Sequence, residues 1–263
     1  MLKNKRHLEI LEVLKQDSFV SVRELSLRLY ASQPTIRRDL IFLEQQGYVL
    51  RNHGGAVLAD GKNHTPLNFR KETKPKEKMQ ICQLAATLIQ PESLIFVDAS
   101  TTAAYLADFL KEGDRVSVVT NGLSLCHTLS KKQIPVFSTG GRVLKDSEAF
   151  VGRIAEENLA RFNGDWMFFS SSALSEEGMV SDYCEEETAL MQAMHRHSQR
   201  HVLLIEAGKF GNRSPFHRFS LEEIDYIVTN MALPEELLRR YRFTLIRQSL
   251  PVRLYEKKCE KNF

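Results

Sequence analysis

Apolar positions at the start of the chain recur with a helical period. Leu8, Leu11 and Leu14 fall on one stripe between charged side chains, which predicts an amphipathic helix. Ser21–Glu24 has the sequence of a capping box, in which the serine and glutamate side chains each satisfy a backbone N–H group of the other residue. A second short helix is therefore predicted from this box to about Tyr30.

A third helix is predicted directly after a tight turn. Ser32 can cap its N-terminus, and the helix runs to about Gln46. Because successive residues are about 100° apart around a helix, the apolar positions Ile36, Leu40 and Leu43 lie on one inward face. The outward face near the N-terminus then carries polar and basic side chains, namely Gln33, Thr35, Arg37 and Arg38.

Two short strands are predicted after the third helix. The segment Tyr48–Val57 is arranged around an Asn-His-Gly tip, as in a β-hairpin. Two helices joined by a tight turn and followed by a hairpin form a winged helix-turn-helix, whose second helix enters the major groove of DNA. Arginine suits that helix because its planar fork bonds guanine O6 and N7 together. The predicted DNA contacts are Ser32, Gln33, Thr35, Arg37, Arg38, Arg51 and His53.

These motifs resemble the N-terminal signature of the DeoR family of bacterial transcriptional regulators. The resemblance covers Ser32–Leu40, with its TIRRDL core, and Arg51–Ala56, with its HGGA. It implies a repressor whose affinity for DNA is lowered by a phosphorylated sugar or a related metabolite. Family members carry an acidic residue and an alanine where this chain has Gln33 and Pro34, so we expect different bases to be read there. We interpret Asp39 as an orienting partner of the two arginines before it, since a carboxylate that faces phosphate is repelled.

Positive charge is concentrated in the first part of the chain. The net charge is +3, but residues 1–78 hold 15 Lys and Arg against 9 Asp and Glu, so the remainder is net acidic. A basic module joined to a mildly acidic one favours a polyanionic partner, double-stranded DNA, for the first part only. Two alternatives stay open at this point: a charged surface that serves only solubility, and a helix-turn-helix that contacts only protein.

Short apolar runs alternate with helical stretches in the rest of the chain. The expected fold class is α/β: a winged helix-turn-helix followed by a larger Rossmann-like domain, whose parallel sheet is covered by helices on both faces. The expected strands are residues 93–97, 116–120, 135–138, 166–169, 201–205 and 225–229. The expected domains are a DNA-binding domain at 1–58, a basic linker at 59–78, an effector-binding domain at 79–250 and a charged tail at 251–263.

Small polar residues follow several of the expected strands. Ligands of parallel sheets bind beyond the carboxyl ends of the strands, where hydroxyl groups and helix N-terminal N–H groups suit a phosphate or sugar hydroxyls. Capping a helix or a turn is the alternative role of each residue taken alone. The expected effector-binding residues are Asp98, Ser100, Thr101, Thr102, Asn121, Gly140, Gly141 and Lys209. Among them Lys209 can neutralise a phosphate.

A second resemblance concerns this larger domain. The order of D-x-S-T-T, T-N, T-G-G and G-K-F-G along the chain is similar to that of the DeoR-family sensor domain, which looks like ribose-5-phosphate isomerase in fold. Glu206–Gly208 stands where family members have Asp-Ser-Ser, so we expect an unusual effector, a small molecule of the sugar-phosphate class.

An isomerase is the alternative function of the larger domain. Isomerisation needs a carboxylate base and a group that stabilises the enediolate. The stretch Ser170–Ala173 contains no carboxylate where the related isomerase carries an Asp-Gly-Ala-Asp stretch, so we expect a regulator and not an enzyme. Asp98 and Glu206 are the conceivable bases of the alternative.

The sequence predicts no cofactor and no metal site, because its eight histidines and four cysteines show no ligand spacing. Its apolar runs are far shorter than the ~20 residues of a membrane helix, and no secretory leader follows the basic start. We therefore expect a cytoplasmic protein with no membrane partner. A repeated or palindromic operator matches two copies of the winged helix, which predicts a homo-oligomer.

Overall fold

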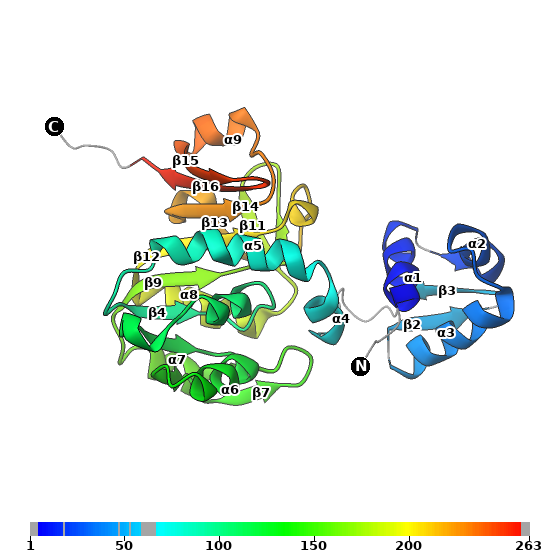
Figure 1. The fold of residues 1–263 in the computed structure, drawn as a ribbon, viewed down its shortest axis with the longest axis horizontal. Helices are drawn as coiled ribbons and strands as arrows, with labels where there is room; N and C mark the ends of the chain where they lie inside the picture. Colours follow the sequence, from blue (N-terminus) through cyan, green and yellow to red (C-terminus); the bar gives the residue numbers. More distant parts are fainter. Residues whose placement is uncertain (1–4, 18, 47, 53, 59–66, 259–263) are drawn as a thin grey trace. The chain divides into compact units, whose positions relative to one another are not determined.

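The computed structural model describes residues 5–17, 19–46, 48–52, 54–58 and 67–258, and the chain divides into two compact units, residues 1–73 and 74–263 (Figure 1). No helix within these described ranges is long and apolar enough to cross a membrane. In the same ranges, no group of three or more His, Cys, Asp or Glu side chains is placed to hold a metal ion. Each unit has a hydrophobic core of its own.

The first unit packs three helices around one core. The helices are α1 (Lys5–Gln16), α2 (Val22–Arg28) and α3 (Gln33–Gln45). Both expected serine caps form, since Ser21 accepts a hydrogen bond from the N–H of Glu24 and Ser32 accepts one from the N–H of Thr35. The apolar stripes of the helices meet in the core, as expected, and bury Leu11, Leu14, Leu25, Ile36, Leu40 and Leu43.

A three-stranded antiparallel sheet completes the winged helix. The strands are β1 (Val20–Ser21), β2 (Val49–Asn52) and β3 (Gly55–Leu58), in the spatial order β1-β3-β2. β2 and β3 form the expected hairpin, with Arg51 opposite Ala56. Gly55 has no room for a side chain, because a Cβ atom there would lie 2.4 Å from the carbonyl oxygen of Val20. A further helix, α4 (Leu67–Glu72), follows the hairpin in the chain.

An eight-stranded sheet forms the centre of the second unit. Its strands, in spatial order, are β15 (Phe243–Ser249), β16 (Val252–Lys257), β14 (Tyr226–Thr229), β12 (Ser198–Ile205), β9 (Gly164–Phe169), β4 (Leu94–Val97), β5 (Ser117–Thr120) and β6 (Val136–Ser138). The strands from β14 to β6 run parallel, as expected. β15 and β16 add an antiparallel hairpin at one edge.

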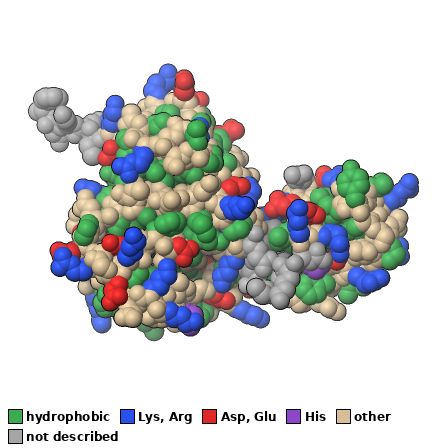
Figure 2. All heavy atoms as spheres, in the orientation of Figure 1, with side chains coloured by type: hydrophobic (Ala, Val, Ile, Leu, Met, Phe, Trp, Pro, Cys, Tyr) green, Lys and Arg blue, Asp and Glu red, His purple; other side chains and the backbone are tan. Residues whose placement is uncertain are grey.

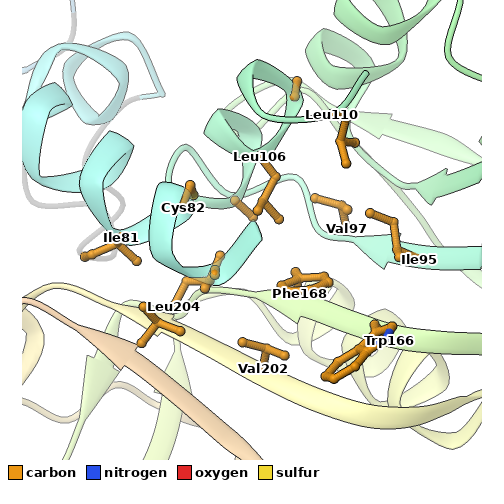
Figure 3. Close-up of a cluster of buried hydrophobic side chains, with 14 of the residues drawn as sticks. Ile81, Cys82, Ile95, Val97, Leu106, Leu110, Trp166, Phe168, Val202 and Leu204 are labelled. Carbon is orange, nitrogen blue, oxygen red and sulfur yellow. The ribbon is translucent and has the colours of Figure 1, made fainter. Parts of the chain in front are cut away.

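Helices cover both faces of this sheet. Alternate residues along each strand enter two separate cores, so that Ile95 and Val97 face one core and Phe96 the other. The first face is covered by α5 (Pro75–Ala85), the 3-10 helix η2 (Ala103–Asp108) and α6 (Leu123–Lys131). The second face is covered by α7 (Arg153–Leu159), α8 (Glu185–Arg196) and α9 (Glu235–Arg240). Figure 3 shows part of the first core, with side chains from α5, η2, β4, β9 and β12.

Two smaller sheets were not expected from the sequence pattern. One is the hairpin of β7 (Arg142–Leu144) and β8 (Ala149–Val151); the other consists of β10 (Ala173–Leu174), β11 (Met179–Asp182) and β13 (Phe216–Ser220). Short 3-10 helices stand between the other elements: η1 (Ala86–Leu88), η3 (Glu112–Asp114), η4 (Ala207–Lys209) and η5 (Leu221–Glu223). The sheet of β10, β11 and β13 places residues 182 and 218 beside the carboxyl end of β9.

The structure corrects two expectations about the chain's connecting and terminal segments. The basic linker was expected to extend through residue 78, but α5 begins at Pro75 and buries Lys78. The segment from residue 251 was expected to be a charged tail, yet its described part forms β16 between β14 and β15. Val252 and Leu254 of this strand are buried, so its apolar alternation outweighs the charges around it.

Candidate functional site

The N-terminal half of α3 presents a polar face to solvent. The side chains of Gln33, Arg37 and Arg38 are exposed, and Thr35 is half-buried. Within the described part of the chain, neither arginine pairs with a carboxylate, whereas Arg6, Arg28 and Arg51 all do. Two cations without counter-ions near a helix N-terminus favour an anionic partner. Figure 2 shows Lys and Arg side chains at several places on the visible face of this unit.

Two hydroxyl groups at the start of α3 contact each other. Ser32 is the N-cap of the helix, and its hydroxyl lies 2.8 Å from the hydroxyl of Thr35. Each hydroxyl still has capacity for another hydrogen bond, because a hydroxyl group is one donor and two acceptors. The pair therefore fixes the start of α3 and leaves it able to contact a ligand.

Arg51 of the hairpin is held by α3. Its Nε donates to Oε2 of Glu44 at 2.7 Å, and its backbone N–H donates to Oε1 at 3.1 Å. These hydrogen bonds lower the pKa of Glu44 below its usual value. Glu44 thus offsets the charge of Arg51 and fixes the hairpin against the helix. His53, the other hairpin residue expected to contact DNA, lies outside the described residues.

Asp39 is directed inward, away from the exposed arginines of the same helix. Its carboxylate is buried and accepts hydrogen bonds from Nε of Arg6 at 2.5 Å and from Nε2 of His7 at 2.9 Å. The expectation that Asp39 orients Arg37 and Arg38 is therefore wrong. Burial acts to raise the pKa of Asp39, but the hydrogen bonds from Arg6 and His7 outweigh it and hold the pKa below its usual value. Asp39 joins the start of α1 to the middle of α3.

The carboxyl ends of β4 and β9 meet where the order of the strands reverses. β5 and β6 lie on one side of β4, while β9 and β12 lie on the other, which makes a topological switch point. Asp98 follows β4, and Ser170 follows β9. The N–H of Ser170 donates to Oδ2 of Asp98 at 3.3 Å, and the hydroxyl of Ser100 donates to Oδ1 at 2.6 Å. Two expected residues are thus joined to Ser170, which was not in the expected set.

The carboxyl group of Asp98 is in an unusual environment. Burial raises the pKa of Asp98 to about 6, although the hydrogen bond from Ser100 and the charge of Arg218 act to lower it. The folded protein thus holds a carboxyl group that changes charge close to neutral pH, at the switch point of the sheet. Such perturbed groups are concentrated at functional sites.

Lys209 and Thr102 converge on one carboxylate from different strand ends. Nζ of Lys209 donates to the hydroxyl of Ser170 at 3.1 Å and lies 3.5 Å from Oε1 of Glu206. The same Glu206 oxygen accepts a hydrogen bond from the hydroxyl of Thr102 at 2.9 Å. Both Thr102 and Glu206 are buried. Hydrogen bonds and one ion pair therefore connect five residues: Asp98, Thr102, Ser170, Glu206 and Lys209. We call these five residues the switch-point group.

Lys78 is a further residue of this region, which the sequence analysis placed in a linker. It is buried on α5, and its Nζ donates to the hydroxyl of Thr101 at 3.1 Å. Burying an ammonium group is costly unless it is paired and hydrogen-bonded, and the bond to Thr101 supplies one such hydrogen bond. The sequence did contain a signal, because Ile81 and Cys82 lie three and four positions later on the buried face of the same helix.

The ends of β5 and β6 contribute differently. Asn121 is buried; its Nδ2 donates to the carbonyl of Phe150 at 3.4 Å, but its Oδ1 has no hydrogen-bond partner in the described structure. A buried acceptor without a partner requires an explanation, such as a ligand or a water molecule. Gly140 and Gly141 have φ values of 65° and 99°, and a Cβ atom at Gly141 would lie 2.6 Å from a backbone carbonyl oxygen. Backbone geometry by itself therefore explains both glycines.

A buried ion pair supports the serine loop after β9. Asp182 accepts hydrogen bonds from the N–H and hydroxyl of Ser172, at 3.0 and 2.8 Å, and from the hydroxyl of Ser171 at 3.3 Å. Nη2 of Arg218 lies 3.2 Å from the same carboxylate. Burial acts to raise the pKa of Asp182, but the charge of Arg218 and the hydrogen bonds keep the pKa below its usual value. Asp182 thus places a carboxylate beside Ser170–Ala173, a stretch that contains no carboxylate itself. The hydrogen bonds and the charge of Arg218 that lower the pKa of Asp182 make this carboxylate a poor base.

Comparison with known proteins identifies both units. A DeoR-like helix-turn-helix domain matches residues 6–62, and the DeoR C terminal sensor domain matches residues 73–231. The chain is 29% identical over 240 residues to the glycerol-3-phosphate regulon repressor of Escherichia coli (strain K12), which covers 91% of this chain and 95% of that protein. It is 30% identical over 232 residues to the HTH-type transcriptional repressor GlcR of Bacillus subtilis (strain 168), which covers 88% of this chain and 89% of that protein.

Solved structures resemble the chain more distantly. Ribose 5-phosphate isomerase A from Methanocaldococcus jannaschii is 11% identical and covers 73% of this chain and 83% of that chain, with a TM-score of 0.41. At this distance the likeness supports no conclusion about function.

A winged helix-turn-helix joined to a parallel-sheet sensor domain defines a DNA-binding transcriptional regulator. The chain belongs to the DeoR family of such regulators. Its partners are accordingly operator DNA and a small-molecule effector, and its relatives are named as regulators and repressors, not as enzymes. The principal expectation from the sequence is confirmed, and the isomerase alternative is not.

Proposed function

We propose that this regulator represses an operon of sugar metabolism and leaves its operator when a phosphorylated sugar or a related metabolite binds the sensor domain. The switch-point group carries the proposal, because it gathers buried polar residues where parallel sheets bind ligands. A relative named for the glycerol-3-phosphate regulon supports both repression and a phosphorylated effector.

The loop that opens η2 is the proposed phosphate site. Thr101 and Thr102 supply hydroxyl groups there, and Ser100 accepts a hydrogen bond from the N–H of Ala103 at 3.1 Å, as a helix cap does. Lys78, whose Nζ donates to the hydroxyl of Thr101, places a positive charge beside this loop. A phosphate therefore meets hydroxyl groups, backbone N–H groups and a cation in a largely buried site.

The remaining expected residues are assigned to the rest of the effector. Asp98 and the unpartnered Oδ1 of Asn121 offer acceptors for hydroxyl groups of a sugar. Lys209 supplies a second charge, partly offset by Glu206. Gly140 and Gly141, which follow β6, are assigned backbone contacts to the effector.

DNA recognition is assigned to α3. Gln33, Thr35, Arg37 and Arg38 enter the major groove, while Ser32 and Arg51 contact the sugar–phosphate backbone, and His53 stays a prediction. The regulator works in the cytoplasm as a homo-oligomer that presents two such helices to a repeated or palindromic operator. Effector binding favours an arrangement that fits DNA poorly, and a coupling of about 1–3 kcal/mol gives a 5- to 150-fold loss of affinity.

A DNA titration tests the proposal. Labelled DNA from the region upstream of the protein's own gene is titrated at fixed salt, with and without a panel of sugar phosphates. Specific binding that one compound weakens is expected, because both units then act together. Specific binding that no compound of the panel changes, or an absence of specific binding, contradicts the proposal.

Two variants separate the two units in the same assay. Arg38→Ala is expected to weaken operator binding by about 1–3 kcal/mol, because it removes a base contact. Lys209→Ala is expected to keep operator affinity and to reduce the response to the effector. Lys131→Ala, at the exposed end of α6, is the matched control. Unchanged affinity in the first variant, or a full response in the second, removes the assigned role.

A further inference from the structure

Asn230 joins two segments that lie far apart in the sequence. It follows β14, and its Oδ1 accepts a hydrogen bond from the N–H of Ala207 at 2.7 Å. Its Nδ2 donates to Oε2 of Glu77 at 2.7 Å. A side-chain amide is a donor and an acceptor at once, so it can bridge a backbone N–H group and a carboxylate. Asn230 therefore links η4, which begins at Ala207, to the first turn of α5.

The segment on one side of this bridge carries part of the switch-point group. Glu206 is the N-cap of η4, and Lys209 is its last residue. Nζ of Lys209 lies 3.5 Å from Oε1 of Glu206, and Ala207 stands between the two in the chain. A change in the position of this pair on effector binding is thus passed to the N–H group that Asn230 holds.

The helix on the other side of the bridge is also bonded to the proposed phosphate loop. Nζ of Lys78 donates to the hydroxyl of Thr101 at 3.1 Å, and Sγ of Cys82 donates to the carbonyl of Thr102 at 3.0 Å. Both loops that the effector is proposed to contact are therefore joined to α5. Asn230 makes the connection to η4 and is not itself among the residues assigned to the effector.

α5 is the first helix of the second unit. Thr73 ends the first unit, and Lys74 begins the second and is the N-cap of α5. The backbone of Lys74 has φ 50° and ψ 47°, in the left-handed region, although Pro75 follows it. Residues other than glycine rarely adopt this region, and a residue before proline is normally extended. Such strain persists only where surrounding contacts impose it, so the contacts of α5 hold the backbone at the joint between the units.

We propose that Asn230 is a coupling residue of this regulator, which transmits the state of η4 through Glu77 to the joint at Lys74. Effector binding shifts η4, the bridge carries the shift to the first turn of α5, and the backbone of Lys74 relaxes toward the extended conformation. The chain of the DNA-binding unit enters the sensor domain at this joint, so the arrangement that fits DNA is lost. Asn230 acts as a positioning residue and contacts neither effector nor DNA. This inference rests on the proposed function, because it takes the switch-point loops as the effector site.

Two substitutions break the bridge from opposite ends. Asn230→Asp keeps an acceptor for the N–H of Ala207 but places a second carboxylate against that of Glu77, and like charges repel. Glu77→Ala removes the acceptor on α5 and preserves the helix, because alanine has the highest helix propensity. A protein that folds is therefore expected from at least the second substitution.

A double variant rebuilds the bridge. In Glu77→Gln combined with Asn230→Asp, the new amide donates to the new carboxylate, and the net charge equals that of the wild type. Glu77→Gln alone keeps an acceptor for the amide of Asn230. Asn163→Asp is the matched control for an added negative charge, since Asn163 is exposed and precedes the amino end of β9, at the opposite edge of the sheet.

The test is a titration of operator DNA with the full-length proteins at fixed ionic strength. The compounds added are glycerol 3-phosphate, ribose 5-phosphate and glucose 6-phosphate. With one of them the wild type is expected to lose DNA affinity about 5- to 150-fold, whereas Asn230→Asp and Glu77→Ala lose less than about twofold. The double variant, Glu77→Gln and Asn163→Asp are each expected to keep at least about half of the wild-type response.

Binding of the same compound to the DNA-free proteins separates coupling from effector binding. Calorimetry is expected to give Asn230→Asp an affinity within about threefold of the wild type, because Asn230 does not contact the effector and the added charge is screened. A residue that only stabilises the fold would instead lower the unfolding temperature and leave the response of DNA binding unchanged.

The outcomes distinguish this inference from the proposed function. If the wild type responds to a compound and both bridge-breaking variants respond equally, the coupling role is wrong and the proposed function stands. If Asn230→Asp loses most of its affinity for the compound, Asn230 belongs to the effector site and the coupling role is overturned. A folded double variant that does not recover the response also overturns it. If no compound changes DNA binding by the wild type, the inference and the proposed function are both wrong.

Discussion

Glu206 accepts a hydrogen bond from the hydroxyl of Thr102 at 2.9 Å, although the strands that carry these residues into the site are not neighbours. β9 lies between β4 and β12, so the bond spans a strand at the level of the carboxyl ends. The same oxygen lies 3.5 Å from Nζ of Lys209. Glu206 therefore connects the proposed phosphate loop to the lysine and reduces the net positive charge between them.

Two substitutions of Glu206 are expected to distinguish the effect of its charge from the effect of its position. Glu206→Gln keeps an acceptor for Thr102 and removes the negative charge, so an anionic effector should bind several-fold more tightly. Glu206→Asp keeps the charge but retracts it from Thr102, which should lower the free energy of unfolding by about 1 kcal/mol. Effector titration and chemical denaturation measure the two effects. Weaker effector binding by Glu206→Gln would show instead that Glu206 accepts hydrogen bonds directly from the effector.

Replacing Asp98 is expected to stabilise the protein at neutral pH. Its pKa of about 6 in the folded protein exceeds the ordinary 3.8, so the folded state favours the protonated form. The contribution of the Asp98 carboxyl group to the free energy of unfolding is fully present below pH 3.8 and is lost as the pH rises through about 6. Asp98→Asn removes that loss, which is on the order of 3 kcal/mol, and the hydroxyl of Ser100 can turn to accept from the new amide.

Thermal unfolding at about pH 5 and pH 7.5 checks this prediction. The advantage of Asp98→Asn over the wild type should be larger at the higher pH. An advantage that is independent of pH would show that the carboxyl group does not titrate in this range. A variant that is more stable but less responsive to effector would show that Asp98 is retained for binding and not for folding.

Asp39 is expected to contribute to folding and not to base recognition. Asp39→Asn removes a buried charge that Arg6 and His7 both bind, so the free energy of unfolding should fall by about 1–3 kcal/mol. Asp17→Asn breaks the exposed pair with Arg28 and is the matched control, with an expected loss below about 1 kcal/mol. Chemical denaturation measures both. Altered base preference in an Asp39→Asn protein of unchanged stability would contradict the structural role.

His195 is expected to make the protein less stable in acid. Its ring stacks on His201, with centroids 3.6 Å apart, and burial lowers the pKa of His195 despite its bond to the carbonyl of Glu223. The unfolded chain takes up this proton at a higher pH than the folded protein does, so stability is lost as the pH falls below the ordinary value of 6.5. His195→Phe keeps a stacked ring and removes the titration.

The difference in unfolding temperature between wild type and His195→Phe is the observable, because it cancels the opposite pH dependence of Asp98. As the pH falls from about 7.5 to about 5.5, the unfolding temperature of His195→Phe should rise relative to that of the wild type. A constant difference over that interval would mean that His195 has the same pKa in both states.

Local patterns determined much of this protein. The spacing of Leu11, Leu14, Ile36 and Leu40 predicted the buried faces of α1 and α3, and alternating strands and helices predicted the parallel sheet. Such patterns suffice because burial follows the 3.6-residue period of a helix and the two-residue period of a strand. The motifs around residues 32–40 and at the strand ends also indicated the family, which the comparisons confirm.

Only the tertiary structure decided the partners of the charged groups. Asp39 pairs with Arg6, Asp98 with Ser170, and Thr102 with Glu206, over separations of 33, 72 and 104 residues. The same holds for β16, whose charges suggested a tail until its pairing with β14 and β15 was seen. The periodicity of a sequence indicates which face of an element is buried, but it does not indicate which distant element covers that face. Packing between elements makes that choice and with it assembles the site.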